Sequence, residues 1–396
     1  MNNSNICFPD YQNSILNLIT SITANFGVPS HHRELSGLKA SFLNSYKNII
    51  LLVLDGLGYN LFSYVKNTKK IFDYNCRISK INSVFPPTTS AAITTLLTGK
   101  SPLEHGAIGW TLYFKEFAKY IDFLPNWDSI TSKVLSQDKY PTLQILDHEN
   151  IFTKINEINP EIDSYYLTPS YIHKSPYTVK YSNPAKVIPF TANRELFSSL
   201  HQIINKIGQK RKFIYIYNTD PDALEHRNGV FSQPVIDFLV KIDSFIKEFI
   251  RENKAGETLL LITADHGLID VNNYHYSNED RELYSTMLMP TFPEPRFSSF
   301  FIKESQKNKF LAEISKYKQK YMILSREDFL AKKLLGTGKP HIKIDDFIGD
   351  FLVIAKSDSA LKTIFQQNGK WEKEFRAHHA GITCDEMEVP LLEIKL

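Results

Sequence analysis

The chain has 396 residues, of which 42% are hydrophobic and 22% are charged, and its formal net charge is +3. These values are ordinary for a globular protein with a substantial core, built as one large domain with an inserted lobe or as two domains. The near balance of charges gives no electrostatic case for binding nucleic acid or an acidic membrane surface. No apolar stretch approaches the length of about 18 residues that a membrane span needs.

The first part of the chain predicts helices that alternate with strands. An amphipathic helical pattern covers about residues 11–26 and ends at Gly27 and Pro29. A nearly unbroken apolar run at 48–54 then predicts a strand buried on both faces. The order continues with a helix at about 59–65, a strand at about 81–85 and a helix that ends at Leu97.

The middle of the chain changes character twice. Residues 110–190 are rich in Tyr, Pro, Asn and Ser, and we expect them to line the core as an insertion rather than to form it. The alternation then returns, with helices at about 191–207 and 233–252 and strands at about 212–217 and 258–263.

Residues 275–370 differ from the rest, because the segments RFSSFFIK, KYMIL and FLVIA read as strands, with a helix at about 305–318 between the first two. That order predicts a small α+β cap lobe inserted into a core of residues 1–274 and 371–396. The final apolar segment VPLLEIKL closes the core as a strand. We therefore expect an α/β fold with a mostly parallel central sheet flanked by helices, plus the inserted lobe.

Residue types that bind metals follow several of the predicted strands. Three of these groups come directly after the buried runs IILLVL, FIYIYN and LLLITA, and a fourth lies in the turn RAHHAG. In open α/β sheets, ligands bind outside the carboxyl ends of the strands, so these side chains can converge at one sheet edge. Taken singly, each group could simply cap a helix or a turn. The residues in chain order are Asp55, Asp222, His226, Asp265, His266 and His379.

Carboxylate oxygen and imidazole nitrogen suit zinc, which is bound by three protein ligands in catalytic sites and keeps one position open. Six ligands divide into two sets of three, so the count predicts two ions. Manganese and iron also occupy mixed sites of this kind. Two metals roughly 3.5–4 Å apart can hold the attacking and leaving oxygens of a phosphoryl transfer.

The segment SVFPPTTSAAITTLLTGKSPLEHG supplies hydroxyl groups at the predicted start of a helix. A hydroxyl there is by default a helix cap. Free N–H groups at a helix start also bind phosphate, and metal coordination can activate a hydroxyl as a nucleophile. The residues themselves leave Thr88, Thr89 and Ser90 as candidates.

These motifs resemble the type I phosphodiesterase/nucleotide pyrophosphatase family of the alkaline phosphatase superfamily, and the chain is most similar to its bacterial branch. The resemblance runs from about residue 48 to the C-terminus. It is carried, in the family's order, by VLDGLG, FPPTTSAAITTLLTGKSPLEHG, TDPDALEHRNG, TADHG and HHAGITCDEMEVPLL. It implies an alkaline-phosphatase-like core.

The resemblance also implies roles for individual residues. Thr89 would be the nucleophile, because counting back from Thr98 and Gly99 places it at the family's nucleophile position. One zinc would be held by Asp55, Asp265 and His266, with the Thr89 oxygen as a further ligand. The other zinc would be held by Asp222, His226 and His379. His378 competes with His379, but the family's turn matches His379, Ala380 and Gly381 better.

The chain departs from the family at the position where many members carry an Asn that binds phosphate oxygens. In EHGAIGW this position holds Trp110, so we expect different phosphate contacts. Ser90, Trp110 and Tyr113 are candidate substrate-binding residues. Core packing is the equally weighted alternative for Trp110, Tyr113 and Phe114.

We therefore expect a two-zinc phosphoryl-transfer hydrolase that cleaves phosphodiester or pyrophosphate bonds of nucleotides or related small molecules through a covalent threonine intermediate. A phosphomonoesterase or a phosphonate hydrolase on the same core is an alternative. An inactive zinc-containing binding protein is another. The expected partner is a small-molecule phosphoester substrate.

The cysteines and the N-terminal segment carry little further information. Cys7, Cys76 and Cys384 are too few and too scattered for a disulfide framework, and we expect Cys384 as a packed or partly exposed thiol. The first residues show no basic segment followed by an apolar one, so no Sec signal is visible. Cytoplasmic residence is the default expectation, and export without such a signal would leave no mark of this kind.

Overall fold

A seven-stranded sheet forms the centre of the molecule. The computed structural model describes residues 6–206, 208, 210–253, 256–367, 370–371 and 374–396. In the sheet, the strands from β9 to β7 are parallel, whereas β20 is antiparallel to both β2 and β9. The strand order is β2 (Arg77–Asn82), β20 (Glu388–Lys395), β9 (Thr258–Thr263), β1 (Asn48–Leu54), β8 (Lys212–Asn218), β6 (Asp163–Pro169) and β7 (Lys186–Phe190).

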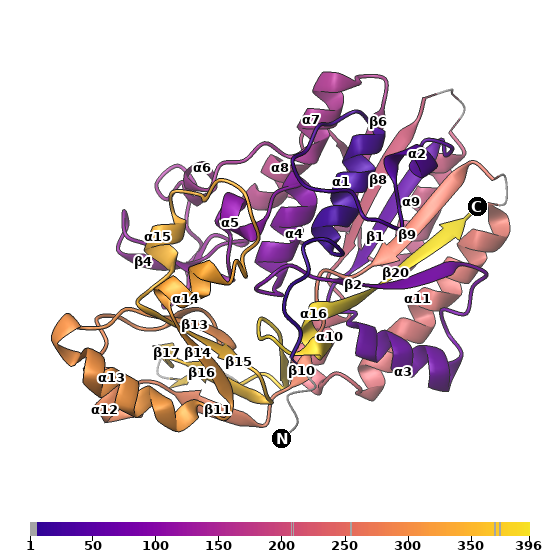
Figure 1. Cartoon of the computed structure of the whole chain (residues 1–396). Coiled ribbons are helices and arrows are strands. Elements are labelled where there is room, and N and C mark those ends of the chain that lie inside the picture. Colours follow the sequence, from indigo (N-terminus) through magenta and orange to yellow (C-terminus); the bar gives the residue numbers. More distant parts are fainter. Residues whose placement is uncertain (1–5, 207, 209, 254–255, 368–369, 372–373) are drawn as a thin grey trace.

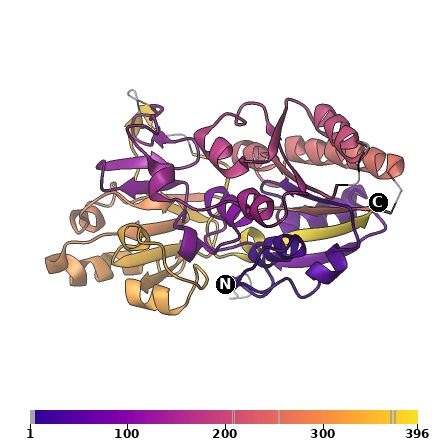
Figure 2. The same ribbon diagram turned by 90° about the horizontal axis from the view of Figure 1, so that it is seen from above.

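Helices cover both faces of this sheet (Figures 1 and 2). One group packs around α4 and consists of α1 (Ile15–Asn25), α4 (Thr89–Thr98), α7 (Ile151–Ile158) and α8 (Pro176–Ser182). The other group packs around α11 and consists of α3 (Tyr59–Lys69), α9 (Asn193–Ile204) and α11 (Gln233–Glu252). Shorter helices join these layers: α2 (Ala40–Leu43), α5 (Pro102–His105), α6 (Thr142–Ile145), α10 (Asp222–Asn228) and α16 (Cys384–Met387).

The mostly parallel sheet flanked by helices confirms the expected fold class. Strand β1 occupies the predicted range, and every residue of β1 and β9 is buried, as an unbroken apolar run in a central strand requires. The predicted strand at 81–85 begins earlier, at Arg77, and ends at Asn82. Because β2 is a half-exposed edge strand, its alternating side chains form no apolar run. The buried Val84 and Phe85 follow it in a turn.

Residues 110–190 depart from the expectation that they would only line the core. A separate three-stranded sheet does form there, from β3 (Thr111–Phe114), β4 (Lys119–Asp122) and β5 (Trp127–Asp128). Strands β6 and β7, however, belong to the central sheet. Tyr166 of β6 stacks on Tyr215 of β8 with ring centroids 5.2 Å apart. The tyrosines of β6 suggested a segment outside the core, but a buried Tyr packs as an apolar ring, and β6 is a core strand.

The segment between β10 (Ile269–Asp270) and β19 (Ala377–His378) builds a second layer of structure beside the core (Figures 1 and 2). Its antiparallel sheet has the order β12 (Phe292–Glu294), β13 (Phe297–Phe300), β15 (Phe351–Ala355) and β14 (Tyr321–Ser325). Its helices are α12 (Arg281–Ser285), α13 (Lys307–Ile314), α14 (Arg326–Ala331) and α15 (Ile344–Phe347), with 3-10 turns η2 (Glu304–Gln306) and η3 (Ser315–Tyr317). Two strand pairs complete it: β11 (Asn273–Tyr276) with β16 (Ser359–Lys362), and β17 (Gln366–Gln367) with β18 (Lys370–Trp371).

This lobe is packed onto the core rather than separated from it. The Phe85 ring lies 5.1 Å from the Phe297 ring, centroid to centroid, and joins lobe and core in one apolar cluster. A smaller cluster around Phe300, Phe310 and Phe351 belongs to the lobe alone. The predicted division of the chain into a core (1–274 and 371–396) and a lobe (275–370) stays a prediction. Some positions in these predicted ranges, such as 1–5 and 368–369, lie outside the residues that the structure describes.

Two further links tie distant segments together. Cys7 and Cys384 form a disulfide, so the expectation of a Cys384 thiol was wrong. The pairing joins positions 377 residues apart, which no local spacing can reveal. Arg296 of the lobe and Glu386 of α16 form a fully buried ion pair. Among the described residues, no helix combines the length and the apolar character needed to cross a bilayer.

Candidate active site

Three of the predicted ligands converge at the ends of β1 and β9. His266 Nε2 lies 3.5 Å from Asp55 Oδ1 and 3.4 Å from Asp265 Oδ2. Asp55 is 2% exposed, and Asp265 and His266 are fully buried. The Asp265 carboxylate is held by the backbone, because it accepts hydrogen bonds from the N–H groups of Gly56 and of His266. Asp55, Asp265 and His266 are named the inner trio here.

The other three predicted ligands gather beside the inner trio. Asp222 and His226 lie one turn apart in α10, directly after β8, and His226 Nε2 is 3.2 Å from Asp222 Oδ1. His379, directly after β19, brings its ring to 5.1 Å from the His226 ring, between centroids. Asp222, His226 and His379 are named the outer trio. The two trios are neighbours, since the rings of His266 and His379 are 4.1 Å apart.

Hydrogen bonds to backbone carbonyls determine which imidazole nitrogen carries the proton. His226 Nδ1 lies 2.7 Å from the Ala377 carbonyl oxygen, and His266 Nδ1 lies 3.2 Å from that of Gly267. A carbonyl oxygen can only accept, so both rings carry a proton on Nδ1, and Nε2 is the nitrogen that faces the carboxylate oxygens. With Nε2 deprotonated, each ring would offer this nitrogen, together with the carboxylates, to a cation.

Unpaired oxygens at the same place support a cation site. Asp55 Oδ1 and Asp265 Oδ2 are buried and have no hydrogen-bond donor, and the same is true of His379 Nδ1. Burial raises the pKa of Asp55 well above its ordinary value, and the charges of Asp265 and Asp222 raise it further. Burial lowers the pKa of His379 well below its ordinary value, and His266 and His226 add to this effect. The donor set therefore fits two divalent cations that supply the missing charge.

Thr89 is the hydroxyl that reaches this cluster. It is the first residue of α4, after the extended N-cap residue Thr88. Its Oγ1 lies 3.1 Å from His266 Nε2, beside the inner trio. The Thr88 hydroxyl instead donates to Glu294 Oε1 at 2.6 Å, and Ser90 Oγ is buried without a hydrogen-bond partner. Of the three neighbouring hydroxyls, Thr89 thus has the contact with the inner trio.

A pocket of about 700 Å³ opens from the cluster. Asp55, Thr89 and Asp222 lie at its base, and Trp110 is among the side chains of its wall. The rest of the wall is largely apolar and aromatic, with Trp127, Tyr166, Tyr171, Tyr177 and Tyr217, and one lysine, Lys174. A pocket of this size accommodates a small molecule, and its few polar groups gather where the chemistry would occur.

The structure separates the other candidate residues. Trp110 lines the pocket, but Tyr113 packs against Tyr120 and Phe292, with ring centroids 5.0 Å and 6.3 Å away, and is not among the lining residues. Core packing therefore describes Tyr113 better than substrate binding. His378 lies next to the outer trio, with its ring 5.4 Å from that of His226, but it belongs to neither group of converging ligand atoms.

Two neighbours of the site were not found from the sequence. The Tyr217 hydroxyl donates to Asp55 Oδ2, and its position at the end of the apolar strand β8 could have indicated it. Glu294 of the lobe accepts hydrogen bonds from the Thr88 hydroxyl and from the Trp110 N–H, both at 2.6 Å. Burial raises the pKa of Glu294 to about 7. No motif marks Glu294, because its contacts join segments about 200 residues apart.

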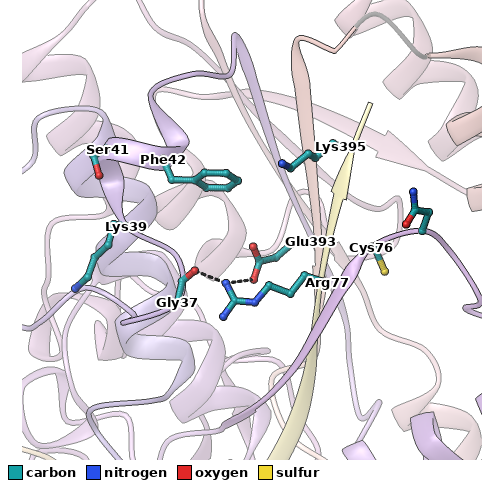
Figure 3. Close-up of a pocket in the computed structure, with 9 residues that line it drawn as sticks. Gly37, Lys39, Ser41, Phe42, Cys76, Arg77, Glu393 and Lys395 are labelled. Carbon is teal, nitrogen blue, oxygen red and sulfur yellow. Dashed lines mark hydrogen bonds and ion pairs between the residues drawn. The ribbon is translucent and has the colours of Figure 1, made fainter.

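A second hollow lies at the opposite end of the sheet (Figure 3). It has a volume of about 760 Å³ and is lined by residues near the start of β2 and the end of β20. Arg77 bridges the Gly37 carbonyl and Glu393, and Lys395 lies over the Phe42 ring at 5.3 Å. No residue of either trio lines this hollow, so it is not part of the candidate active site.

Comparison with known proteins agrees with this geometry. The mostly parallel sheet flanked by helices is the architecture of the alkaline phosphatase superfamily, a class of phosphoryl-transfer hydrolases. A family model described as type I phosphodiesterase/nucleotide pyrophosphatase matches residues 49–380, and the chain belongs to this family. The family is generally metal-dependent, and the chain is a hydrolase that acts on phosphoesters. Comparison with curated protein sequences gave no match.

Solved structures support the fold. Murine ectonucleotide pyrophosphatase/phosphodiesterase 5 superposes with a TM-score of 0.62 at 14% identity, over 87% of each chain. An inactive threonine-to-alanine variant of that murine protein in complex with AMP gives 0.63 at 13% identity, also over 87% of each chain. Phosphonoacetate hydrolase from Sinorhizobium meliloti 1021 in complex with phosphonoacetate gives 0.62 at 14% identity, over 88% of this chain and 90% of the other.

Proposed function

We propose that the chain is a two-zinc hydrolase that cleaves phosphodiester or pyrophosphate bonds of nucleotides or related small molecules through a covalent intermediate on Thr89. The observation that carries this proposal is the convergence of the two trios and one hydroxyl at a single sheet edge. The two trios and one alcohol come from five separate segments, and three of these residues, Asp55, Thr89 and Asp222, line one pocket. A purely structural metal site would not need the alcohol or the pocket.

Each trio would hold one zinc ion. The inner trio offers two carboxylates and one imidazole, with the Thr89 oxygen as a further ligand, and the outer trio offers one carboxylate and two imidazoles. Both sets are of the kind that zinc favours, with a position left for substrate. When bound, the two ions supply positive charge that lowers the pKa of the Thr89 hydroxyl and offsets the charge of the phosphate oxygens.

Thr89 and the start of α4 would carry out the transfer. Thr89 Oγ1 forms a bond to phosphorus while the bond from phosphorus to the leaving oxygen breaks. The hydroxyl proton passes to solvent, and the leaving oxygen takes up a proton. The free N–H groups in the first turn of α4 stabilise the phosphate oxygens. In the second step, water adds to phosphorus, the bond to Thr89 breaks, and the threonine hydroxyl is restored.

The pocket would bind the organic groups that the phosphate carries. Its aromatic walls, with the half-exposed Trp110 and Trp127 and the exposed Tyr171, offer flat surfaces on which a base or an aryl group can stack. The inactive threonine-to-alanine variant of the murine structural neighbour, bound to AMP, is consistent with a threonine nucleophile and a nucleotide ligand. For this chain, the threonine nucleophile and the nucleotide ligand are both part of the proposal.

Turnover of a small panel of phosphoesters tests the proposal. The purified protein should hydrolyse p-nitrophenyl-TMP faster than p-nitrophenyl phosphate, lose activity with a chelator and regain it with zinc. The Thr89→Ala variant should lose at least about 10⁴-fold in turnover, because removing a nucleophile leaves only residual catalysis. Ser90→Ala is the comparison variant, since its neighbouring hydroxyl has no hydrogen-bond partner, and it should lose far less turnover. A fully active Thr89→Ala enzyme would overturn the nucleophile assignment.

A phosphonate hydrolase is the second candidate, because a phosphonoacetate hydrolase shares the fold over most of both chains. The panel therefore includes phosphonoacetate. Hydrolysis of phosphonoacetate without turnover of the diester would favour this alternative. Bound zinc with no turnover of any panel member would favour an inactive binding protein.

A further inference from the structure

A second group of ligand atoms lies away from the active site, where the loop between α1 and α2 meets α5. His31 Nε2 is 2.9 Å from Glu104 Oε1, and His32 Nε2 is 2.6 Å from Glu104 Oε2. The two imidazole rings lie 4.1 Å apart, between centroids. Neighbouring side chains of an extended segment point in opposite directions, so a bend is needed to aim both rings at one carboxylate, and the chain bends at His31 and His32. His31, His32 and Glu104 are named the His–Glu cluster.

The carboxylate of this cluster is buried. The Glu104 side chain is 7% exposed, and Oε2 also accepts a hydrogen bond from the Ser101 N–H at 2.8 Å. The groups that contact it directly are two imidazoles and the backbone N–H and side chain of Ser101, none of which carries a permanent positive charge. These hydrogen bonds offset part of the cost of burying the carboxylate, and a divalent cation between the three side chains would neutralise its charge.

The cluster lies where three segments of the chain meet. Glu104 is so close to Gly338 that a Cβ atom on this glycine would lie 2.3 Å from Glu104 Cδ. The Ser101 hydroxyl donates to the Thr337 carbonyl at 2.9 Å, which brings the lobe onto α5. The loop with His31 and His32 covers the other side. An ion here would connect the N-terminal loop to the contact between core and lobe.

Access for an ion is also present. The His31 side chain is 63% exposed, and a hollow of about 510 Å³ beside the cluster is lined by His32, Ser30 and Glu34. Solvent can therefore reach the ligand atoms from one side, which leaves room for water at a further coordination position. All three ligand atoms lie within 4.8 Å of one another.

We propose that His31, His32 and Glu104 bind a structural zinc ion in addition to the two ions of the active site. Two imidazole nitrogens and one carboxylate oxygen with an open position form a donor set that zinc accepts. Binding requires a lone pair on each Nε2, so the ring protons move to Nδ1. The cluster shares no residue with either trio, and its ion does not take part in the reaction.

Metal counting on the full chain tests this proposal. Protein freed of metal with a chelator is titrated with Zn²⁺, and bound zinc is measured by elemental analysis after desalting. The double variant His31→Ala/His32→Ala should bind one zinc ion fewer per chain than the unmodified protein. His201→Ala is the matched control, because His201 is also partly exposed and faces a glutamate, Glu252, at 3.8 Å, but has no second imidazole partner. It should bind the full number.

A second variant separates coordination from hydrogen bonding. Glu104→Gln keeps an oxygen that accepts hydrogen bonds but removes the charge, so it should also lose one zinc ion per chain. In Co²⁺-loaded protein, both variants should lose part of the visible absorption, and this readout does not depend on turnover. Equal zinc content in the unmodified protein and in the His31→Ala/His32→Ala variant would overturn the proposal. Phosphoester turnover should stay unchanged, so a failure here is distinct from a failure of the proposed function.

Discussion

The inner and outer trios differ in charge and in burial. The inner trio has two carboxylates and one imidazole, and none of its residues is more than 2% exposed. The outer trio has one carboxylate and two imidazoles, and the side chains of Asp222 and His226 are 14% and 15% exposed. With a divalent ion, the inner set would be neutral overall and the outer set would keep one positive charge. Under the proposed function, the inner trio would hold its ion and the nucleophile, and the outer trio would attract the phosphate.

The largest expected effect comes from removing one carboxylate of either trio. Asp55→Asn and Asp222→Asn should each lower turnover by about 10³-fold or more, because each would remove a ligand of a proposed ion that would stabilise the transferred phosphate. Their effects on the chelated protein should differ. Asp55→Asn relieves repulsion between buried carboxylates and should raise the melting temperature without metal, whereas Asp222→Asn also removes the attraction to His226 and should raise it less. Identical melting shifts for the two variants would contradict the distinction.

Arg296→Met should be the most destabilising single change near the outer trio. Arg296 binds both oxygens of Glu386, at 2.7 Å and 2.8 Å, and neither side chain is exposed. Removing one partner leaves a buried charge and costs about 3–5 kcal/mol of unfolding free energy. Glu386 also accepts from the Gly381 N–H, two residues after His379, so loss of the pair should weaken zinc binding at the outer trio first.

Denaturant unfolding and zinc titration of Arg296→Met measure these two effects. Arg326→Met is the control, because its partner Asp345 is 82% exposed and such a surface pair contributes at most about 1 kcal/mol. An Arg296→Met protein as stable as this control would show that the buried pair does not support the turn.

Acid should destabilise the protein through an imidazole outside both trios. Burial and the neighbouring Lys100 together lower the pKa of His148 to about 4. Between about pH 6.5 and pH 4, His148 is protonated in the unfolded chain but stays neutral in the folded protein. The free energy of unfolding therefore falls as the pH falls through this window. The loss amounts to about 3 kcal/mol. The free energy of unfolding of chelated protein, measured across these pH values, should depend less on pH for His148→Gln than for the unmodified protein.

The smallest expected effect is the order in which the two ions leave. The outer trio offers one carboxylate fewer and is more exposed, so its ion should dissociate first during titration with a chelator. Affinity depends on the number of charged ligands, and we expect at least about a tenfold difference between the two dissociation constants. Loss of both zinc ions in a single step would contradict this order. An Asp265→Asn variant that keeps the tightly bound ion, while Asp222→Asn loses it, would assign that ion to the outer trio instead.

Much of the candidate active site could be predicted from the sequence, because its residues follow strands that are recognisable as unbroken apolar runs. Asp55 and Asp265 end runs of buried apolar residues, and the carboxyl ends of parallel strands meet at one edge. Their convergence with Asp222, His226 and His379 is now a feature of the structure. Their roles as zinc ligands stay a prediction.

Features that depend on contacts between distant segments could not be predicted. Strand β6 is rich in tyrosine, and its place in the sheet follows from stacking on Tyr215 rather than from an apolar run. Glu294 reaches Thr88 from the lobe, and Cys7 pairs with Cys384 from the other end of the chain. The His–Glu cluster joins a loop to α5 across about 70 residues, and adjacent histidines in a loop carry no period that would indicate a common partner.

The buried pair of Arg296 and Glu386 has a consequence for how substrates enter. Swinging the lobe away from α16 as a rigid body would pull two opposite charges apart inside the protein, with neither in contact with water. We infer that the lobe stays docked throughout turnover. Substrate and product would then enter and leave through the pocket itself, which is lined by Trp127 of the β3–β4–β5 sheet and by Tyr171.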